Sequence, residues 1–222
     1  MFDKKWKQLY ASSDTIRYLA EENSGQVAVS ERALYLPPGE YTIGTQFKDV
    51  GGRAYGAKYE DIVVDPYVPG AFGISDVELA SEVYEDFAEV LKGGLAVIPI
   101  PTRTYRRDKP VLIYYEVYGL KRGEFGQSRY GVTYTIGPAE HEGKFFGNVL
   151  RSIGKVLKAE QKETVRISTE QVGYREDQSK YIEMDVSKSE AGKYNLQVTV
   201  TDLVRNQTVT KETSFWVLIP QD

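Results

Sequence analysis

The sequence predicts an all-β protein built from two tandem antiparallel β-sandwich modules. Three observations support this fold class: a repeated unit, segments in which apolar and polar residues alternate, and a high content of tyrosine. The chain has 17 Tyr, 8 Phe and 2 Trp, and aromatic residues fit the pleated, half-buried surface of a sheet. With 222 residues, 41% of them hydrophobic, it is long enough to fill the core of one large domain or two ordinary ones.

One unit occurs twice without a gap, as GEYTIGTQFKDV near the beginning of the chain and as GKYNLQVTVTDL near its end. Glycine, tyrosine and aspartate fall at equal offsets in both copies, and apolar residues lie between them. The shared residues are Gly39, Tyr41 and Asp49 in the first copy and Gly192, Tyr194 and Asp202 in the second. Such self-similarity predicts that two modules share a local structure.

Each copy has the pattern of a hairpin with one wet face. Tyr194, Leu196 and Val198 alternate with polar residues, which is typical of an antiparallel strand packed on one side. Asp202 is expected to close an Asx-type turn, and the segment 209–219 resumes the alternation as the returning strand.

The Gly-x-Tyr-x-apolar start of each copy resembles the tyrosine corner of immunoglobulin-like sandwiches. The resemblance implies that both modules are immunoglobulin-like and that Tyr41 and Tyr194 hydrogen-bond to backbone a few residues upstream. A stabilising role for these two tyrosines is therefore favoured over a binding role.

A Pro/Gly-rich break over residues 65–73 divides the chain into modules 1–66 and 67–222. Strands are expected in the second module at Ile74–Ser81, Leu95–Ile100, Val111–Tyr118, Tyr130–Ile136, Thr164–Val172 and Tyr181–Val186, before the hairpin. The first offers only Lys5–Ala11, Thr15–Ala20 and Gln26–Leu36 before its hairpin, and a sandwich of this kind needs about seven strands. We therefore expect the first module to be incomplete and to be completed from outside, by upstream sequence or by a strand from another copy or a partner.

A helical period interrupts the strands near 144–158. Phe146, Leu150, Ile153 and Leu157 follow the spacing of an apolar helix stripe, which predicts one short inserted helix in the second module. This helix is expected to cover an edge or end of the sandwich, and the alternative is a partner-binding or membrane-surface helix.

Charge and residue usage exclude several classes of function. With 28 basic and 32 acidic residues the chain has no positive field for nucleic acid, and no apolar window is long enough for a membrane span. The absence of Cys and the single His141 leave no thiolate or multi-histidine metal site, so no cofactor and no enzymatic activity are expected. The acidic run that contains Asp76 and Glu78 is interpreted as a solvated face; the alternative is a hydrolase that uses two carboxylates.

Two segments hold candidate binding residues. In VLIYYEVYGL, alternation places Tyr114, Glu116 and Tyr118 on one face, where they form a platform for a sugar or peptide if neighbouring elements leave that face open. The basic run around Arg103, Arg106 and Arg107 is interpreted as a solvated loop, with a protein interface as the alternative.

The segments IPIPTRTYRRDKPVLIYYEVYGL, SRYGVTYTIGP and SEAGKYNLQVTVTDL resemble the C-terminal β-rich region of bacterial GWxTD-domain proteins over roughly residues 72–218. The Gly-Trp-x-Thr-Asp motif that names that family is absent, which places the naming domain upstream if the resemblance holds. The resemblance implies an extracytoplasmic bacterial protein, periplasmic or at the cell surface, and assigns no catalytic residue.

These observations predict a non-catalytic interaction or scaffold module of an extracytoplasmic bacterial protein or assembly. A protein partner, or self-assembly, is expected through the N-terminal module. The alternative is a carbohydrate- or peptide-binding module that uses the Tyr/Glu strand face.

Overall fold

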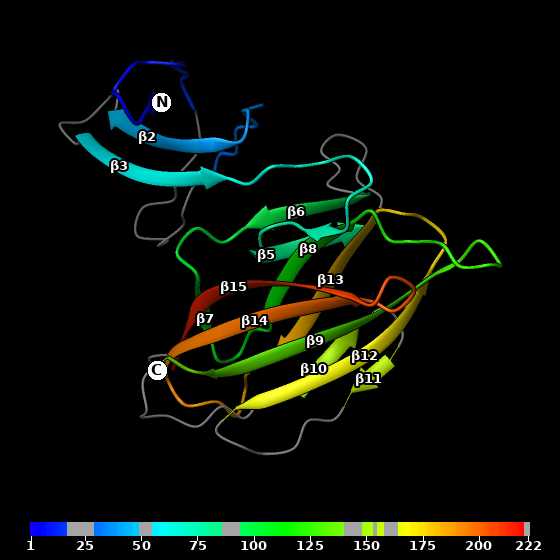
Figure 1. Cartoon of the computed structure of the whole chain (residues 1–222). Helices are drawn as coiled ribbons and strands as arrows, with labels where there is room; N and C mark the ends of the chain where they lie inside the picture. The colour runs from blue at the N-terminus through cyan, green and yellow to red at the C-terminus, as the bar shows by residue number, and fades with distance from the viewer. Residues whose placement is uncertain are drawn as a thin grey trace. The chain divides into compact units, whose positions relative to one another are not determined.

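The computed structural model describes residues 1–16, 29–48, 55–85, 94–139, 148–152, 155–157 and 164–219. These residues form an all-β protein of mainly antiparallel sheets and contain no helix. The described part of the chain therefore holds no helix with the length and apolarity to cross a bilayer. Two compact units, Met1–Val68 and Pro69–Asp222, divide the chain (Figure 1).

The first unit holds a three-stranded antiparallel sheet in the order β1-β2-β3. Its strands are β1 (Phe2–Asp3), β2 (Gly39–Lys48) and β3 (Tyr55–Val64). The strand predicted at Lys5–Ala11 is wrong, because the Asp3 carboxylate accepts the amides of Lys5 and Lys7 and turns the chain back there. Residues 29–36 of the third predicted strand are not extended into a sheet either, and residues 17–28 lie outside the described part of the chain.

The second unit holds two sheets that face one another (Figure 1). One has the order β11-β10-β13-β8-β5-β6, with β4 also paired to β8, and the other has the order β12-β9-β14-β15-β7. Its strands are β4 (Gly73–Ile74), β5 (Glu78–Glu85), β6 (Leu95–Pro99), β7 (Thr104–Arg106), β8 (Val111–Tyr118), β9 (Ser128–Pro138), β10 (Asn148–Ser152), β11 (Lys155–Leu157), β12 (Val165–Gly173), β13 (Gln178–Asp185), β14 (Gly192–Asp202) and β15 (Gln207–Leu218).

Alternation along the strands builds the core between these two sheets. Val111, Ile113 and Tyr115 on β8 are fully buried, as are Leu196 and Val198 on β14. Every second residue of these strands faces the opposite sheet, which is the arrangement of a β-sandwich. Tyrosine hydroxyls are also satisfied inside, since those of Tyr115 and Tyr134 hydrogen-bond to each other at 2.5 Å.

The two copies of the repeat form hairpins with the same register. Gly39 pairs with Val64 in the first, and Gly192 pairs with Val217 at the same separation in the second. The two glycines also share nearly the same backbone angle, with φ of 156° and 157°. The gapless sequence match therefore corresponds to a match in strand pairing.

Both corner tyrosines make the predicted hydrogen bond. The Tyr41 hydroxyl donates to the Pro37 carbonyl at 2.7 Å, and the Tyr194 hydroxyl donates to the Glu190 carbonyl at 2.8 Å. Both rings are buried, and both carbonyls lie four residues upstream. Asp49, the first copy's equivalent of Asp202, lies outside the described residues. The immunoglobulin-like nature of the modules stays a prediction.

The predicted helix near 144–158 is wrong where the structure describes that segment. β10 and β11 are strands, and Val149 of β10 pairs with Met184 of β13. The spacing that suggested a helix also accommodates two short strands, and Val149 and Val156 are β-branched. Pairing with β13 therefore overrides a helical pattern that Gly154 already weakens.

The corner hydrogen bond contributes to stability. Tyr194→Phe removes the hydroxyl and leaves the Glu190 carbonyl without this donor, so we expect the free energy of unfolding to fall by about 1 kcal/mol. A denaturant titration measures the change. Tyr174→Phe is the matched control, because Tyr174 is 74% exposed, and it should leave the titration unaltered. An equal effect of both substitutions would contradict a specific role of the corner.

Candidate functional site

A groove of about 570 Å³ lies beside β8 in the second unit. Two connecting segments and one face of β8 form its walls. The lining residues are Ser75, Asp76, Val77, Glu78, Leu79, Pro99, Ile100, Pro101, Arg103, Tyr114, Glu116 and Tyr118. The structure thus brings together Tyr114, Glu116, Tyr118 and Arg103 of the predicted binding residues.

Two tyrosines hold the Glu116 carboxylate in the groove. The Tyr114 hydroxyl donates to one carboxylate oxygen, and the Tyr118 hydroxyl donates to the other at 2.5 Å. Alternation along β8 explains the arrangement, since residues two apart share a face. Tyr114 is only 3% exposed, so it contributes its hydroxyl and no open ring face. Glu116 and Tyr118 are half-buried and present an oriented hydrogen-bond acceptor beside a ring.

The segment 73–79 forms the adjoining wall because it pairs with β8. Gly73 lies opposite Tyr118 in this pairing. The Ser75 amide donates to the Glu116 carbonyl at 2.9 Å, and the Glu116 amide donates to the Ser75 hydroxyl oxygen at 2.9 Å. On the other wall the Ile100 amide donates to the Leu79 carbonyl at 2.9 Å. The groove is therefore bounded by backbone that is hydrogen-bonded to its neighbours.

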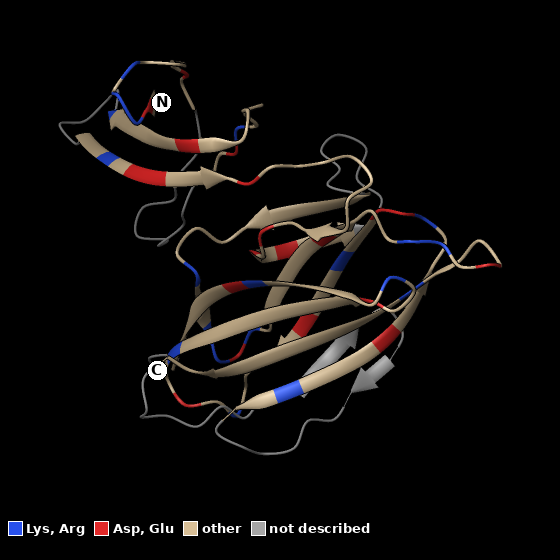
Figure 2. Cartoon of the chain, viewed as in Figure 1, with Lys and Arg blue, Asp and Glu red and all other residues tan. Residues whose placement is uncertain are grey.

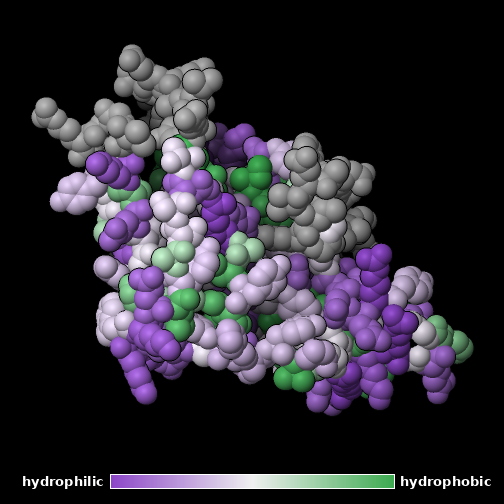
Figure 3. Space-filling model, turned by 90° about the horizontal axis from the view of Figure 1, so that it is seen from above, coloured by the Kyte–Doolittle hydropathy of each residue, from purple (hydrophilic) through white to green (hydrophobic). Residues whose placement is uncertain are grey.

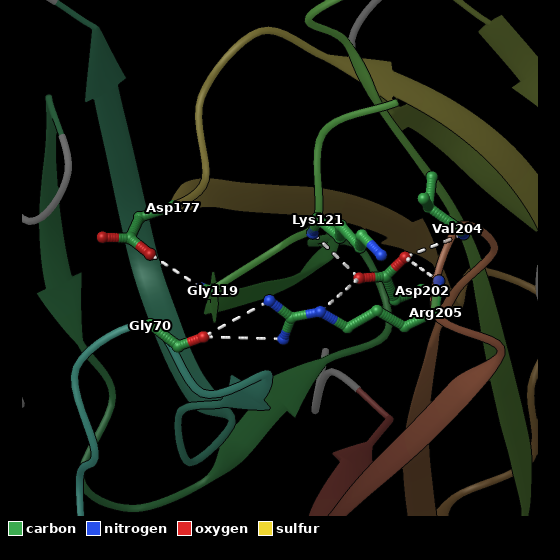
Figure 4. Close-up of polar contacts among 7 residues, drawn as sticks. All are labelled: Gly70, Gly119, Lys121, Asp177, Asp202, Val204 and Arg205. Atoms are coloured by element: carbon green, nitrogen blue, oxygen red, sulfur yellow. Dashed lines mark hydrogen bonds and ion pairs between the residues drawn. The ribbon is translucent and has the colours of Figure 1, made fainter. Parts of the chain in front are cut away.

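A buried carboxylate anchors the chain at the start of this wall (Figure 4). Asp202 is 0% exposed and accepts the Val204 and Arg205 amides on one oxygen and the Lys121 amide on the other, at 2.9 to 3.0 Å. The Arg205 guanidinium lies near the same carboxylate and donates to the Gly70 carbonyl at 3.4 Å. The predicted Asx turn is confirmed. The Asp202 side chain also joins the segment of Lys121, and Arg205 joins the segment of Gly70.

Gly119 lets the backbone of Ala71 approach closely. It has φ of +60°, and a Cβ there would lie 2.2 Å from the Ala71 carbonyl oxygen. The Gly119 amide donates to the Asp177 carboxylate at 2.9 Å (Figure 4). Any residue larger than glycine at this position would displace the backbone of Ala71.

The three arginines of the basic run have different environments. Arg103 is exposed at the groove in a left-handed turn with φ of 51°. Arg106 makes a two-pronged contact with Asp108 at 3.0 and 3.1 Å, so its charge is paired locally. Arg107 is half-buried, and its Nε has no hydrogen-bond partner among the described residues. Only the first of the three lines the groove.

Sequence reasoning missed the groove walls. Ser75, Ile100 and Pro101 carry no motif, and they meet β8 only through the fold. Asp76 and Glu78, interpreted from sequence as a solvated face, line the groove, and Asp76 also pairs with Lys211 at 2.8 Å. The prolines on both sides of Ile100 were the available signal, because they mark a rigid strand end.

Several tyrosines of this unit have pKa values raised by burial. Burial raises the pKa of Tyr114 above its usual value, and its hydrogen bond to Glu116 raises it further. Burial likewise raises the pKa of Tyr105, Tyr115, Tyr130 and Tyr134. These hydroxyls therefore stay protonated through neutral and moderately alkaline pH.

The described residues contain no group of three His, Cys, Asp or Glu side chains placed to hold a metal ion. The fold and the site define the chain as an all-β protein with a groove beside one strand. No family model and no curated protein matches the chain.

Two solved structures share a weak likeness. One is AvmM, described as catalysing macrocyclization in alchivemycin A biosynthesis, with 10% identity over 56% of this chain and 88% of that one and a TM-score of 0.34. The other is the CooA pilin subunit from enterotoxigenic Escherichia coli, with 11% identity over 66% of this chain and 100% of that one and a TM-score of 0.30. Likeness at this level carries no argument about function.

The raised tyrosine pKa values predict a specific loss of stability in alkali. Above about pH 10 tyrosines of the unfolded chain release protons that the buried tyrosines retain, so the free energy of unfolding should fall as pH rises from there. Below the pKa that tyrosine has in the unfolded chain, the buried tyrosines make their full contribution to the free energy of unfolding. Denaturant titrations from pH 7 to 11 measure the curve, and the tyrosinate absorbance of the buried tyrosines should develop only with unfolding. Full tyrosinate absorbance in the folded protein would contradict the assignment.

Proposed function

We propose that this chain is a non-catalytic interaction module that binds a protein partner through its first unit. The observation that carries the proposal is the contrast between the two copies of one hairpin. Phe47 of β2 is 66% exposed, whereas Val200, its equivalent in β14, is 0% exposed. The same face thus packs against a second sheet in one unit, whereas in the other it leaves Phe47 exposed.

Further side chains extend this contrast over the first unit. Among its described residues, Met1 and Tyr41 are the only buried hydrophobic side chains. Large apolar side chains that are more than half exposed are Trp6, Ile16, Tyr35, Phe47, Tyr55, Tyr59, Val63, Tyr67 and Val68. Apolar surface also shows among the polar side chains of the face seen in Figure 3. A large exposed apolar surface is typical of protein interfaces, and this unit has many apolar side chains that can contribute to one.

The second face of the hairpin supports the same conclusion. Tyr55 of β3 is the equivalent of Thr208 in β15, and Tyr59 is the equivalent of Glu212. Aromatic residues thus replace the polar residues expected on a wet face, and aromatic residues are enriched at interface cores. We extend the proposal to an extracytoplasmic bacterial location, which the resemblance to GWxTD-domain proteins supports.

Site-specific photo-crosslinking tests this function in the cells that produce the protein. We expect p-benzoylphenylalanine in place of Phe47 to give one discrete protein adduct. In place of Phe125, which is 87% exposed in the second unit, it should give none. The mass of the adduct tells whether the partner is another copy. Absence of any adduct from position 47 would remove the basis of the proposal.

The groove beside β8 favours a second candidate function, the binding of a carbohydrate or an extended peptide. The Glu116 carboxylate is fixed by two tyrosine hydroxyls and faces a wall that includes the apolar Ile100. Arg103 adds a donor at the same groove. A fixed acceptor, a donor and an apolar wall are the elements by which small sites orient polar ligands.

Calorimetric titration with oligosaccharides and extended peptides tests the groove. Glu116→Gln keeps the size of the side chain but removes its charge, so affinity for a groove ligand should fall by about tenfold or more. Glu170→Gln is the control, because Glu170 is an exposed carboxylate of β12 away from the groove. Binding that both variants retain, or no binding at millimolar ligand, would rule out this candidate.

A further inference from the structure

The outer edge of β3 is a surface for strand pairing. Among the described residues β3 pairs only with β2, so the backbone groups along its other edge meet no strand. β3 is long, running from Tyr55 to Val64, and an exposed edge of this kind is a template for another strand. Its charges lie in one stretch, a basic position followed by acidic ones (Figure 2).

The charges of β3 are complementary to themselves in one register. In an antiparallel pair of identical strands with a two-fold axis at Tyr59, Lys58 of each copy lies directly opposite Glu60 of the other. Opposite charges at such positions stabilise the pair. Lys58 and Glu60 already contact each other at 2.8 Å within one strand, so both point to the same face.

Neighbouring registers are unfavourable. In regular antiparallel pairing of two identical strands, the axis moves by whole residues. An axis at Lys58 places lysine opposite lysine, and an axis at Glu60 places glutamate opposite glutamate, and both arrangements repel. A lone lysine in an edge strand discourages pairing with another strand. Because Glu60 follows two residues after Lys58, the lysine instead favours the one register in which it faces a glutamate.

The favoured register also covers apolar surface. It places Tyr59 opposite Tyr59 and Tyr55 opposite Val63 on the other face of the ribbon. These side chains are 56%, 84% and 66% exposed in the single chain. Aromatic pairs and pairs of an aromatic with a β-branched residue are among the favourable cross-strand contacts.

A second edge strand provides a comparison. β12 is the edge strand of the sheet β12-β9-β14-β15-β7 in the second unit. An antiparallel pair of β12 strands with its axis at Ser168 would place Arg166 opposite Glu170. The outward residues Arg166, Ser168 and Glu170 of β12 are polar, and Val172, 55% exposed, is the one large apolar side chain on that face. Val165 and Ile167 are buried in the core. Pairing at β12 therefore covers much less apolar surface than pairing at β3.

We propose that the partner of the first unit is a second copy of this chain, joined by antiparallel pairing of β3 with β3 about Tyr59. The proposal rests on the proposed interaction function and names its partner. Two first units then share one continuous sheet, the β-augmentation mode of recognition.

Charge exchange tests the pairing in the full chain. Lys58→Glu puts a carboxylate opposite Glu60 of the other copy, and Glu60→Lys puts two lysines opposite each other. Each variant should weaken the dimer by about tenfold or more in sedimentation at low salt. The double variant Lys58→Glu with Glu60→Lys restores both pairs and should dimerise like the original. An equimolar mixture of the two single variants should form heterodimers.

Cysteine crosslinking tests the register, and the chain contains no other cysteine. Tyr59→Cys places its thiol directly opposite its own copy, within disulfide range, so mild oxidation should give a covalent dimer. Tyr55→Cys is the matched control on the same face of the same strand. It lies opposite Val63 in this register and should form no covalent dimer under oxidation.

Three results would overturn the inference: a monomeric chain at high micromolar concentration, covalent dimers from Tyr55→Cys, or dimers from Ser168→Cys of β12 in place of Tyr59→Cys. The charge variants do not alter the Tyr59 ring, so they remain informative if Tyr59→Cys fails to fold. A monomeric chain whose Phe47 position still crosslinks to a different protein would refute self-pairing and leave the interaction function standing.

Discussion

The buried carboxylate of Asp202 is the constraint on which the geometry of the second unit depends. A buried charge is tolerated only when its oxygens are hydrogen-bonded, and three backbone amides and the Arg205 guanidinium meet this requirement. Those donors come from two different loops. Folding therefore has to bring the turn after β14 and the loop before β9 together, or leave the charge uncompensated.

The groove follows from that anchor. Arg205 reaches from the Asp202 carboxylate to the Gly70 carbonyl, and Gly119 lets Ala71 approach closely. The chain is then directed along β8, where Ser75 exchanges hydrogen bonds with the backbone of Glu116. The wall of the groove is thus fixed by contacts that lie outside the groove itself.

Much of this fold follows from local pattern, and the exceptions have a common cause. Alternation gives the bounds of Val111–Tyr118 as observed, and it places Tyr114, Glu116 and Tyr118 on one face. The basic run around Arg106 has the sequence of a solvated loop, yet Thr104–Arg106 form a strand. Three residues are too few to show a period, and the parallel pairing of this strand with β15 depends on distant sequence.

The candidate site shows the same limit. The Asx turn at Asp202 involves residues two and three positions away and can be predicted, whereas its bond to the Lys121 amide joins distant segments. The helix predicted near 144–158 is wrong for the same reason, since the pairing of β10 with β13 joins distant segments. Contacts between distant segments are what a single sequence leaves undetermined.

The two hairpins show why one sequence pattern leads to two outcomes. Strand pairing and the tyrosine corner need only contacts within about 25 residues, and both copies form them with the same register. Burial of the apolar face needs a second sheet, which the strands of the second unit supply for Phe215 and Val200. The first unit shows no second sheet in its described residues, so Phe47 remains exposed. The first hairpin has its strand pairing and corner hydrogen bond, but it still exposes apolar surface, and burial of that surface favours association. The charges along the edge of β3 can then determine which strand pairs with it.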